Sequence, residues 1–458
     1  MEEKEQVKST KNIQLFENAP IPKAVMSMSV PTIISSLVMV IYNMADTYFV
    51  GMLNSPVQNA AVTLAAPVLL AFNAVTNLFG VGTSSMMSRA LGRKDYETVR
   101  RSSAFGFYCA LFFSILFSVL YTVFHVPLLT LLGADARTAA ATGDYLKWTV
   151  TCGAAPAIMN VILAYLVRSE GFSLHASIGT MSGCLLNIIL DPFFILPWGL
   201  NLGASGAGLA TFLSNCAACL YFFVLLFIRR RRTYVCIRPD MFRLDRFVVS
   251  GVCGVGIPSS IQNLLNVTGM TVLNNFTAAF GSDAVAAMGI AQKISMVPMY
   301  IALGLSQGIM PLISYNYGSR NVPRMKKVIL FSTKIALSFM VVVCLGCYLG
   351  SDFLISQFMK NETIIAYGGA FLRGLCLSTP FMCMDFLAVG VFQSCGMGRK
   401  AFLFAILRKI VLEIPALFLW NYFWPLYGLA YAQLTAEAVL SVAAVLVLYR
   451  LFRSLERV

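Results

Sequence analysis

The chain has 458 residues, a net charge of +14, 58% hydrophobic residues and only 12% charged ones. A soluble protein carries about 25% charged residues, so this composition excludes a soluble globular protein. Apolar runs that are long enough to cross a hydrocarbon core of about 30 Å recur along the sequence. The roughly 10-residue alternating segments of an outer-membrane barrel are not found in it. The sequence therefore indicates an all-α polytopic membrane protein.

We predict twelve transmembrane helices, which in chain order occupy residues 25–50, 59–88, 102–125, 145–167, 175–197, 206–228, 248–278, 284–315, 328–350, 364–392, 402–424 and 428–450. The start of the chain, MEEKEQVKSTKNIQ, is polar and acidic and shows no cleavage site before the first span, which argues against a signal peptide. The predicted parts are an N-terminal tail (1–23), an N-lobe with spans one to six (24–228), a linker (229–246), and a C-lobe with spans seven to twelve and a short C-terminal tail (247–458).

Acidic residues stand inside two spans of the first half. The first span carries Asp46 within YNMADTYFVG, and the fifth carries Asp191 within NIILDP. A charge at the bilayer centre costs about 2.5–3.5 kcal/mol, so such a residue is a functional candidate if it faces protein or water. Asn187 lies four residues before Asp191 and therefore on the same helix face. Pro192 has no N–H for the carbonyl of Ile188, which leaves an oxygen free nearby. The structural alternative is that Asp191 caps a broken helix and that Asp46 bonds Ser or Tyr hydroxyls.

Basic residues concentrate in the tails and the even-numbered connections between spans. The linker, RRRRTYVCIRPDMFRLDR, is the longest polar stretch between spans, and further basic groups stand at 89–101 and 324–327. This positive-inside bias predicts that both termini and the linker are cytoplasmic. No nucleic-acid site is expected, because the positive charge is spread over several short segments.

The second half carries charged residues at different positions from the first. Asp385, Glu413 and Glu437 lie in spans ten, eleven and twelve, and span eight carries Lys293. Glu413 and Glu437 attract cationic substrates in one interpretation, and in another they form a packing pair or face the cytoplasmic mouth. A buried Lys293 either pairs with an acid for structural reasons or has a functional role.

Histidines and cysteines form no catalytic or metal-ligating set in the sequence. His125 and His175 stand near span ends, and the C-x-x-C pairs at 216–219 and 344–347 have no second pair or histidine beside them. These cysteines are better interpreted as small apolar packing residues than as metal or redox ligands. No serine–histidine–aspartate set, P-loop or glycine fingerprint appears, so the sequence predicts neither an enzyme nor a cofactor.

The two halves of the chain repeat each other. The first span carries SVPTIISSL and the seventh GIPSSIQNL; the fourth ends in RSEG and the tenth in QSCG; the sixth opens with GLAT and the twelfth with GLAY. Since each half holds an even number of spans, both halves point the same way and are related by a pseudo-twofold axis along the membrane normal. This is the parallel-repeat plan of some secondary transporters.

These motifs resemble those of the multidrug and toxic compound extrusion (MATE) family. The resemblance rests on YNMADTYFVG, NIILDP, RSEG, QSCG and GLAT, covers about residues 25–450, and is greatest to the bacterial multidrug branches, including the DinF-like one. The family implies a transporter of the bacterial plasma membrane that exports organic cations in exchange for H⁺ or Na⁺ by alternating access of two lobes. The wider superfamily also contains lipid and polysaccharide flippases, which is the alternative function. A flippase would want a cationic cavity, whereas the intramembrane charges here are mostly acidic.

The resemblance also assigns a coupling-ion site to the first half. Members that bind Na⁺ in the N-lobe carry an aspartate in span one, an asparagine and an aspartate four apart in span five, and a threonine in span six. The matching residues here are Asp46, Asn187, Asp191 and Thr211. Such oxygen ligands suit a hard cation. The expected partners are the bilayer and small cationic substrates, and a monomer is expected.

The remaining candidates concern the substrate cavity and the bending of helices. The cavity candidates are Tyr42, Gln262, Asp385 and Glu413, and the helix-bend candidates are Pro31, Pro192 and Pro258. An acid in span ten resembles that of the NorM-like branch, although the residues around Asp385 depart from it. In the expected mechanism, neutralisation of Asp46 and Asp191 lets the first span bend at Pro31 and expels the substrate.

Overall fold

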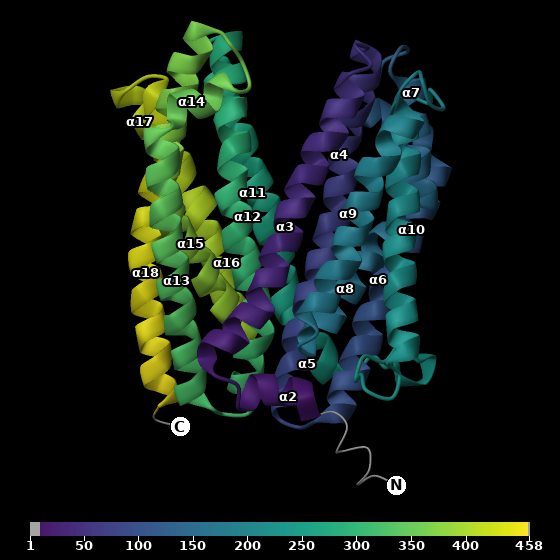
Figure 1. The fold of residues 1–458 in the computed structure, drawn as a ribbon, viewed down its shortest axis with the longest axis vertical. Coiled ribbons are helices and arrows are strands. Elements are labelled where there is room, and N and C mark those ends of the chain that lie inside the picture. The colour runs from purple at the N-terminus through teal and green to yellow at the C-terminus, as the bar shows by residue number, and fades with distance from the viewer. Residues whose placement is uncertain (1–9, 457–458) are drawn as a thin grey trace.

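The computed structural model describes residues 10–456, and every regular element in that range is a helix (Figure 1). Residues 1–9 of the predicted N-terminal tail and residues 457–458 lie outside the described residues. The first half contains α2 (Thr10–Glu17), α3 (Ile21–Gly51), α4 (Pro56–Thr76), η1 (Asn77–Val81), α5 (Gly82–Gly92), α6 (Tyr96–Leu131), α7 (Ala139–Leu146), η2 (Lys147–Cys152), α8 (Ala154–Ser169), α9 (Ser173–Ile195) and α10 (Ala204–Ile228). The second half contains η3 (Pro239–Met241), α11 (Arg246–Ala278), α12 (Ser282–Gly318), α13 (Val322–Leu349), α14 (Ser351–Ser356), α15 (Glu362–Ser394), α16 (Gly398–Ile406), η4 (Leu407–Glu413), α17 (Ile414–Phe423), η5 (Tyr427–Ala430) and α18 (Tyr431–Leu455).

The starts of several helices are fixed by capping residues. The side chains of Asp95, Asp245, Asn321 and Asn361 each accept a hydrogen bond from a backbone N–H in the first turn of α6, α11, α13 and α15. Such a cap satisfies one of the backbone donors that a helix leaves unpaired at its start. The helices that these residues cap begin between two and six residues before the apolar run from which their span was predicted.

Ten helices of the described chain are long and apolar enough to cross a membrane, and an eleventh span counts if the pair Ala139–Cys152 and Ala154–Ser169, bent by 50°, is taken as one. The remaining predicted span, 402–424, is helical from Gly398 to Phe423 but is divided into α16, a π-helical turn (η4) and α17. Its middle carries Arg408, Lys409 and Glu413, so length and composition alone do not identify it as a span. The predicted count of twelve includes this interrupted segment.

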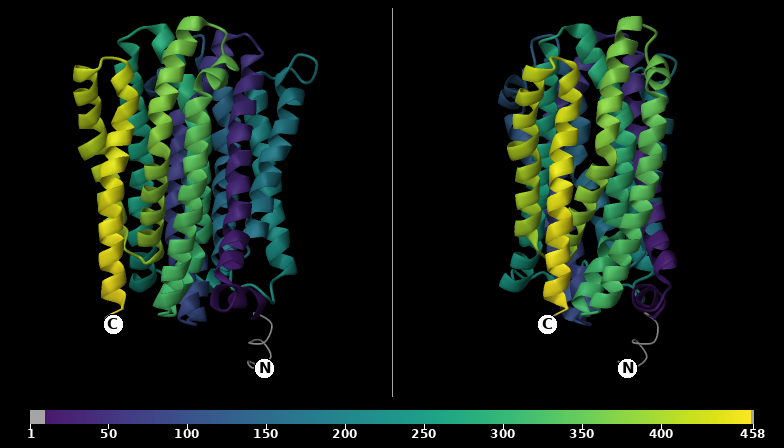
Figure 2. Two further views of the ribbon diagram at one scale, coloured as in Figure 1. Left: turned by 60° about the vertical axis from the view of Figure 1, so that its left-hand side comes forward. Right: turned by 90° about the vertical axis from the view of Figure 1, so that its left-hand side faces the viewer.

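The helices form two lobes, α3–α10 and α11–α18, that lie side by side (Figure 1). Helix α2 and the last turn of α18 lie at the same end of the molecule, which we call the terminal end (Figures 1 and 2). We call the opposite end the distal end. Helix α3 packs against α9 of its own lobe and against α12 of the other, so it lies where the lobes meet.

The lobes touch through glycines near the terminal end. A Cβ atom added at Gly92 would lie 2.1 Å from the carbonyl oxygen of Tyr315, and one added at Gly318 would lie 2.1 Å from that of Arg89. These distances show that the backbones of α5 and α12 are in direct contact, which only glycine permits. Toward the distal end, by contrast, α3 exposes Ile41 (57%) and Tyr48 (64%). The lobes are therefore joined at the terminal end and separate toward the distal end.

The segment between α10 and α11, which corresponds to the predicted linker 229–246, is bonded to the N-lobe. The buried carboxylate of Glu170, in RSEG, accepts hydrogen bonds from the Thr233 hydroxyl (2.6 Å) and from the backbone N–H groups of Tyr234 (2.9 Å) and Val235 (2.8 Å). Burial raises the pKa of the Glu170 carboxyl to about 7, although these three bonds favour its charged form. The linker is thus fixed to one lobe rather than free between the two.

Two glycines in α11 offer a matched test of the contact between the lobes. A Cβ at Gly256 would lie 1.9 Å from the carbonyl oxygen of Leu78 in the other lobe, whereas a Cβ at Gly254 meets nothing within 4 Å. We expect Gly256→Ala to lower the thermal unfolding midpoint of the purified protein, since overpacking of this kind costs about 1–3 kcal/mol. Gly254→Ala should leave the midpoint unchanged. Equal effects of the two substitutions would contradict this account of the interface.

Candidate functional site

The four residues expected to bind the coupling ion come together in the N-lobe. Asn187 and Asp191 lie one turn apart in α9, and Thr211 lies in α10 beside them. With its amide nitrogen turned to Asp191, Asn187 donates to Asp191 Oδ2 at 2.9 Å and accepts from the Thr211 hydroxyl at 3.2 Å. Asp46, in α3, lies close enough to Asp191 for the two carboxylates to interact electrostatically. Residues far apart in the sequence therefore form one group of oxygen atoms.

Two tyrosines complete this group. Tyr42 stands one turn before Asp46 in α3, and its hydroxyl lies beside Thr211. Tyr145, from α7, is buried beside Asp46 and Asp191. Sequence reasoning missed Tyr145 because it stands at the beginning of the fourth span with no motif around it. Only the packing of α7 against α4 and α10 brings its ring to the acids.

The two acids of this site have no basic partner. Asp191 is fully buried, and Oδ1 of Asp46 is buried without a hydrogen-bond partner. Among the described residues, neither carboxylate takes part in any ion pair. Two charged carboxylates cannot be kept together at low cost in a medium of low dielectric constant. The arrangement therefore suits a species that neutralises them, either a proton or a small cation held by several oxygen atoms.

The predicted bend positions all lie within helices. Pro31 is in α3, Pro192 is in α9 directly after Asp191, and Pro258 is in α11. Each helix continues past its proline as one element. Since proline donates no hydrogen bond, each leaves one helical carbonyl without its usual partner. Bending at these positions stays a prediction.

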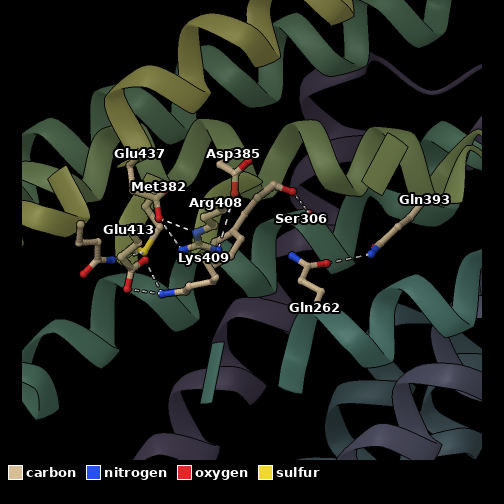
Figure 3. A network of polar contacts seen from close by, with 11 residues as sticks. Gln262, Ser306, Met382, Asp385, Gln393, Arg408, Lys409, Glu413 and Glu437 are labelled. Carbon is tan, nitrogen blue, oxygen red and sulfur yellow. Dashed lines mark hydrogen bonds and ion pairs between the residues drawn. The ribbon is translucent and has the colours of Figure 1, made fainter. Parts of the chain in front are cut away.

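A second cluster of charged residues lies buried in the C-lobe (Figure 3). Arg408 donates to Glu437 Oε1 from Nε at 2.6 Å, and its Nη1 lies 3.6 Å from Asp385 Oδ2. The next residue, Lys409, donates from Nζ to both carboxylate oxygens of Glu413, one turn further along, at 2.8 and 2.6 Å. Both cations lie in the π-helical turn η4. Such turns are rare and occur often at functional sites.

The C-lobe cluster shows where the second-half candidates lie. Asp385 and Glu413 are only 1% and 5% exposed and face cations, not an open cavity. Gln262, in α11, accepts a hydrogen bond from the Gln393 side chain of α15 at 3.4 Å (Figure 3). The proposed packing of Glu413 with Glu437 is replaced by two separate ion pairs, one with Lys409 and one with Arg408.

Two basic residues of this cluster were missed, and one was wrongly placed. The sequence analysis did not single out Arg408 and Lys409, although the spacing of Lys409 and Glu413 is that of a helical ion pair. The interpretation of Lys293 as a buried residue paired with an acid is wrong, because Lys293 is exposed and no ion pair includes it within the described residues. The period of a helix does not say which of its faces meets the protein interior.

The Lys409–Glu413 pair allows a test of whether the C-lobe charges are structural. We expect Glu413→Gln to destabilise the protein by about 3–5 kcal/mol, because it leaves the buried Lys409 ammonium without its counter-charge. The double variant Lys409→Met with Glu413→Gln should recover most of that loss, since no uncompensated charge remains. The measurement is thermal unfolding in detergent. A double variant as unstable as Glu413→Gln would show that the pair does more than neutralise itself.

Comparison with known proteins gives matches that divide the chain in the same way as the two lobes. The MatE family model matches twice, over residues 31–193 and over residues 258–419, so one match falls in each lobe. The multidrug export protein MepA of Staphylococcus aureus (strain MRSA252) is 33% identical over 438 residues, which are 95% of each chain. The double match agrees with the internal repeat predicted from the paired motifs.

Solved structures share the whole fold. The outward-facing conformation of a multidrug resistance MATE family transporter of the MOP superfamily is 27% identical and matches with a TM-score of 0.90, over 98% of this chain and 99% of that one. A MOP superfamily transporter from Pyrococcus furiosus, for which a binding pocket of reverse polarity suggests a different function, is 26% identical with a TM-score of 0.90 over the same shares. With a family model that covers both lobes and a relative similar over nearly its full length, this chain belongs to the MatE family of membrane transporters.

Proposed function

We propose that this transporter is an antiporter that exports amphiphilic organic cations in exchange for H⁺ or Na⁺, and that Asp46, Asn187, Asp191 and Thr211 hold the coupling ion. The observation that carries the proposal is a pair of acids without a basic partner: Asp191, which is fully buried, and Asp46, which is partly exposed but whose Oδ1 is buried. A permanent ion pair would leave such a site nothing to exchange. A site whose acids have no ion-pair partner needs a mobile positive charge that arrives and leaves in each transport cycle.

The chemistry of the same site supports a cationic substrate. If a drug cation and a coupling ion compete for the same two carboxylates, binding of one displaces the other, and this competition alone is sufficient for exchange. Tyr42 and Tyr145 add aromatic faces, which attract organic cations. The name of the S. aureus relative, a multidrug export protein, is consistent with substrates of this kind.

The contact between the lobes supports alternating access. The lobes meet at the terminal end and separate toward the distal end, so a substrate leaves through the distal side in this conformation. In the opposite conformation the glycine contacts of Gly92, Gly256 and Gly318 open and the distal ends close. Binding of the coupling ion at Asp46 and Asp191 favours one of these two states, which is all that coupling requires.

The charges of the connections support a cytoplasmic terminal end. Helix α2, the linker and the end of α18 lie there, and the arginines of the linker lie there with them (Figure 1). By the positive-inside rule these segments stay on the cytoplasmic side of a bacterial-type plasma membrane. We further propose that the protein functions as a monomer, since one chain with its two lobes contains a complete ion site.

Cysteine labelling tests this orientation. A membrane-impermeant thiol reagent added to intact cells should label Asn54→Cys and Asn201→Cys, which stand in connections at the distal end. It should not label Arg232→Cys, in the exposed part of the linker. The unsubstituted protein measures the background from its native cysteines. The reverse pattern would exclude the proposed orientation.

Removing one carboxylate at a time tests the coupling-ion site. Asp191→Asn and Asp46→Asn should keep the fold, because asparagine resembles the protonated acid in shape, but should abolish gradient-driven export of a cationic dye. The double variant should be little worse than either single one, since residues that act as a unit are not additive. Dye efflux from vesicles under a pH gradient and, separately, a Na⁺ gradient gives the rate and identifies the ion.

Asp283→Asn is the matched control for loss of a negative charge, because Asp283 is an exposed acid at the start of α12. It should transport normally at equal expression. Normal efflux by Asp191→Asn would show that its carboxylate has a structural role only, and the proposed site would then be wrong.

A further inference from the structure

A separate cavity of about 650 Å³ lies at the terminal end, outside the ion site. It is formed where the end of α5, the last residues of the linker and the first turns of α11 meet. Its polar lining comes from Arg89, Arg93, Asp245, Arg246 and Ser250. Three arginines therefore line a space large enough for a charged headgroup.

The positive charge of this cavity is not neutralised by the protein. Arg89, Arg93 and Arg246 take part in no ion pair within residues 10–456. Asp245 is already engaged, because it accepts the Phe247 N–H at 3.0 Å as the cap of α11 and lies 3.7 Å from Arg101. An unpaired group of arginines in a concave site attracts an anion from solution.

Neutral contacts hold two of these guanidinium groups in place. Arg89 donates from Nε to the Ser85 carbonyl at 3.2 Å and from Nη2 to the Met86 sulfur at 3.8 Å. Arg93 lies over the Phe247 ring, 5.8 Å from its centroid. These contacts orient the arginines without using up their charge. Arginine forms paired hydrogen bonds to phosphate oxygens when its plane is fixed in this way.

The cavity also joins the two lobes. Arg89 and Arg93 belong to the N-lobe, whereas Arg246 and Gly396 belong to the C-lobe. A Cβ at Gly396, whose φ is +75°, would lie 2.1 Å from Nη1 of Arg89, so the guanidinium group rests directly against the backbone of the other lobe. A ligand in the cavity touches both lobes only while they are closed at this end.

We propose that this cavity binds a phosphate-bearing anion, with the headgroup of an acidic phospholipid of the inner leaflet and free phosphate as its two sources. Basic cavities between helices at the cytoplasmic surface bind acidic lipid headgroups. The bound anion bridges Arg89 and Arg93 of one lobe to Arg246 of the other. It stabilises the conformation in which the terminal end is closed, because the opposite conformation takes the cavity apart.

The test uses the purified full-length protein and three variants: Arg93→Gln, Arg246→Gln and the control Arg243→Gln, which removes an exposed arginine of the linker that does not line the cavity. Short-chain phosphatidylglycerol, short-chain phosphatidylcholine and inorganic phosphate are titrated in turn, and the thermal unfolding midpoint is recorded. The wild type and Arg243→Gln should be stabilised by phosphatidylglycerol and not by phosphatidylcholine. Loss of Arg93 or Arg246 should raise the half-saturating concentration by about fivefold each.

Inorganic phosphate separates the two sources of the ligand. Stabilisation by phosphatidylglycerol beyond that by phosphate at equal concentration assigns the lipid. Equal stabilisation by both, with the same dependence on Arg93 and Arg246, assigns free phosphate. Each variant should unfold at the wild-type midpoint without ligand, and Arg246→Lys should restore part of the response. A response that is absent in the wild type, or unchanged in both glutamine variants of the cavity, overturns the proposal.

Discussion

A charge buried within the membrane has to be neutralised where it stands, because the hydrocarbon core offers neither water nor counter-ions. The two lobes meet this constraint in opposite ways. In the C-lobe, Arg408 and Lys409 form ion pairs with Glu437 and Glu413 within the chain itself, and the third acid, Asp385, lies 3.6 Å from Arg408. In the N-lobe, Asp46 and Asp191 lie together with neutral partners only among the residues described. This difference between halves that share one family model supports the proposal that the exchange of a charge takes place in the N-lobe.

The rest of the fold places this asymmetry where it can be used. Helix α3 carries Tyr42 and Asp46. It packs against α9 of its own lobe and α12 of the other, so its position depends on how the two lobes are arranged. The contacts at Gly92 and Gly318 are between backbones, without interlocking side chains. Backbone contacts of this kind separate without a change of side-chain rotamer, whereas Ser85 and Ser260 also donate hydrogen bonds between the lobes, to the carbonyls of Gln393 and Ala74.

The sequence was sufficient for the features that depend on regular spacing. The spans follow from apolar runs, and the convergence of Asn187, Asp191 and Thr211 follows from helix periodicity and family motifs. It was insufficient where the rotation of a helix about its own axis decides the outcome. Lys293 is exposed although its span is apolar, and Tyr145 reaches the acids only because of how α7 packs. The pairing of Arg408 with Glu437 joins two helices by a contact that no local pattern contains.

The attachment of the linker has a mechanical consequence. Beyond Glu170, the N-lobe holds it through the Tyr108 hydroxyl, which donates to the Ile237 carbonyl at 2.7 Å, and through stacking of Phe242 on Phe105. The last of these attachments, Asp245, stands directly before α11. The segment is therefore a strap carried by one lobe, not a slack tether between two. A rotation of the lobes, as proposed above, would therefore bend the chain at the junction with α11. The length of α11 would turn a small change of backbone angle there into a large displacement at the far side of the membrane.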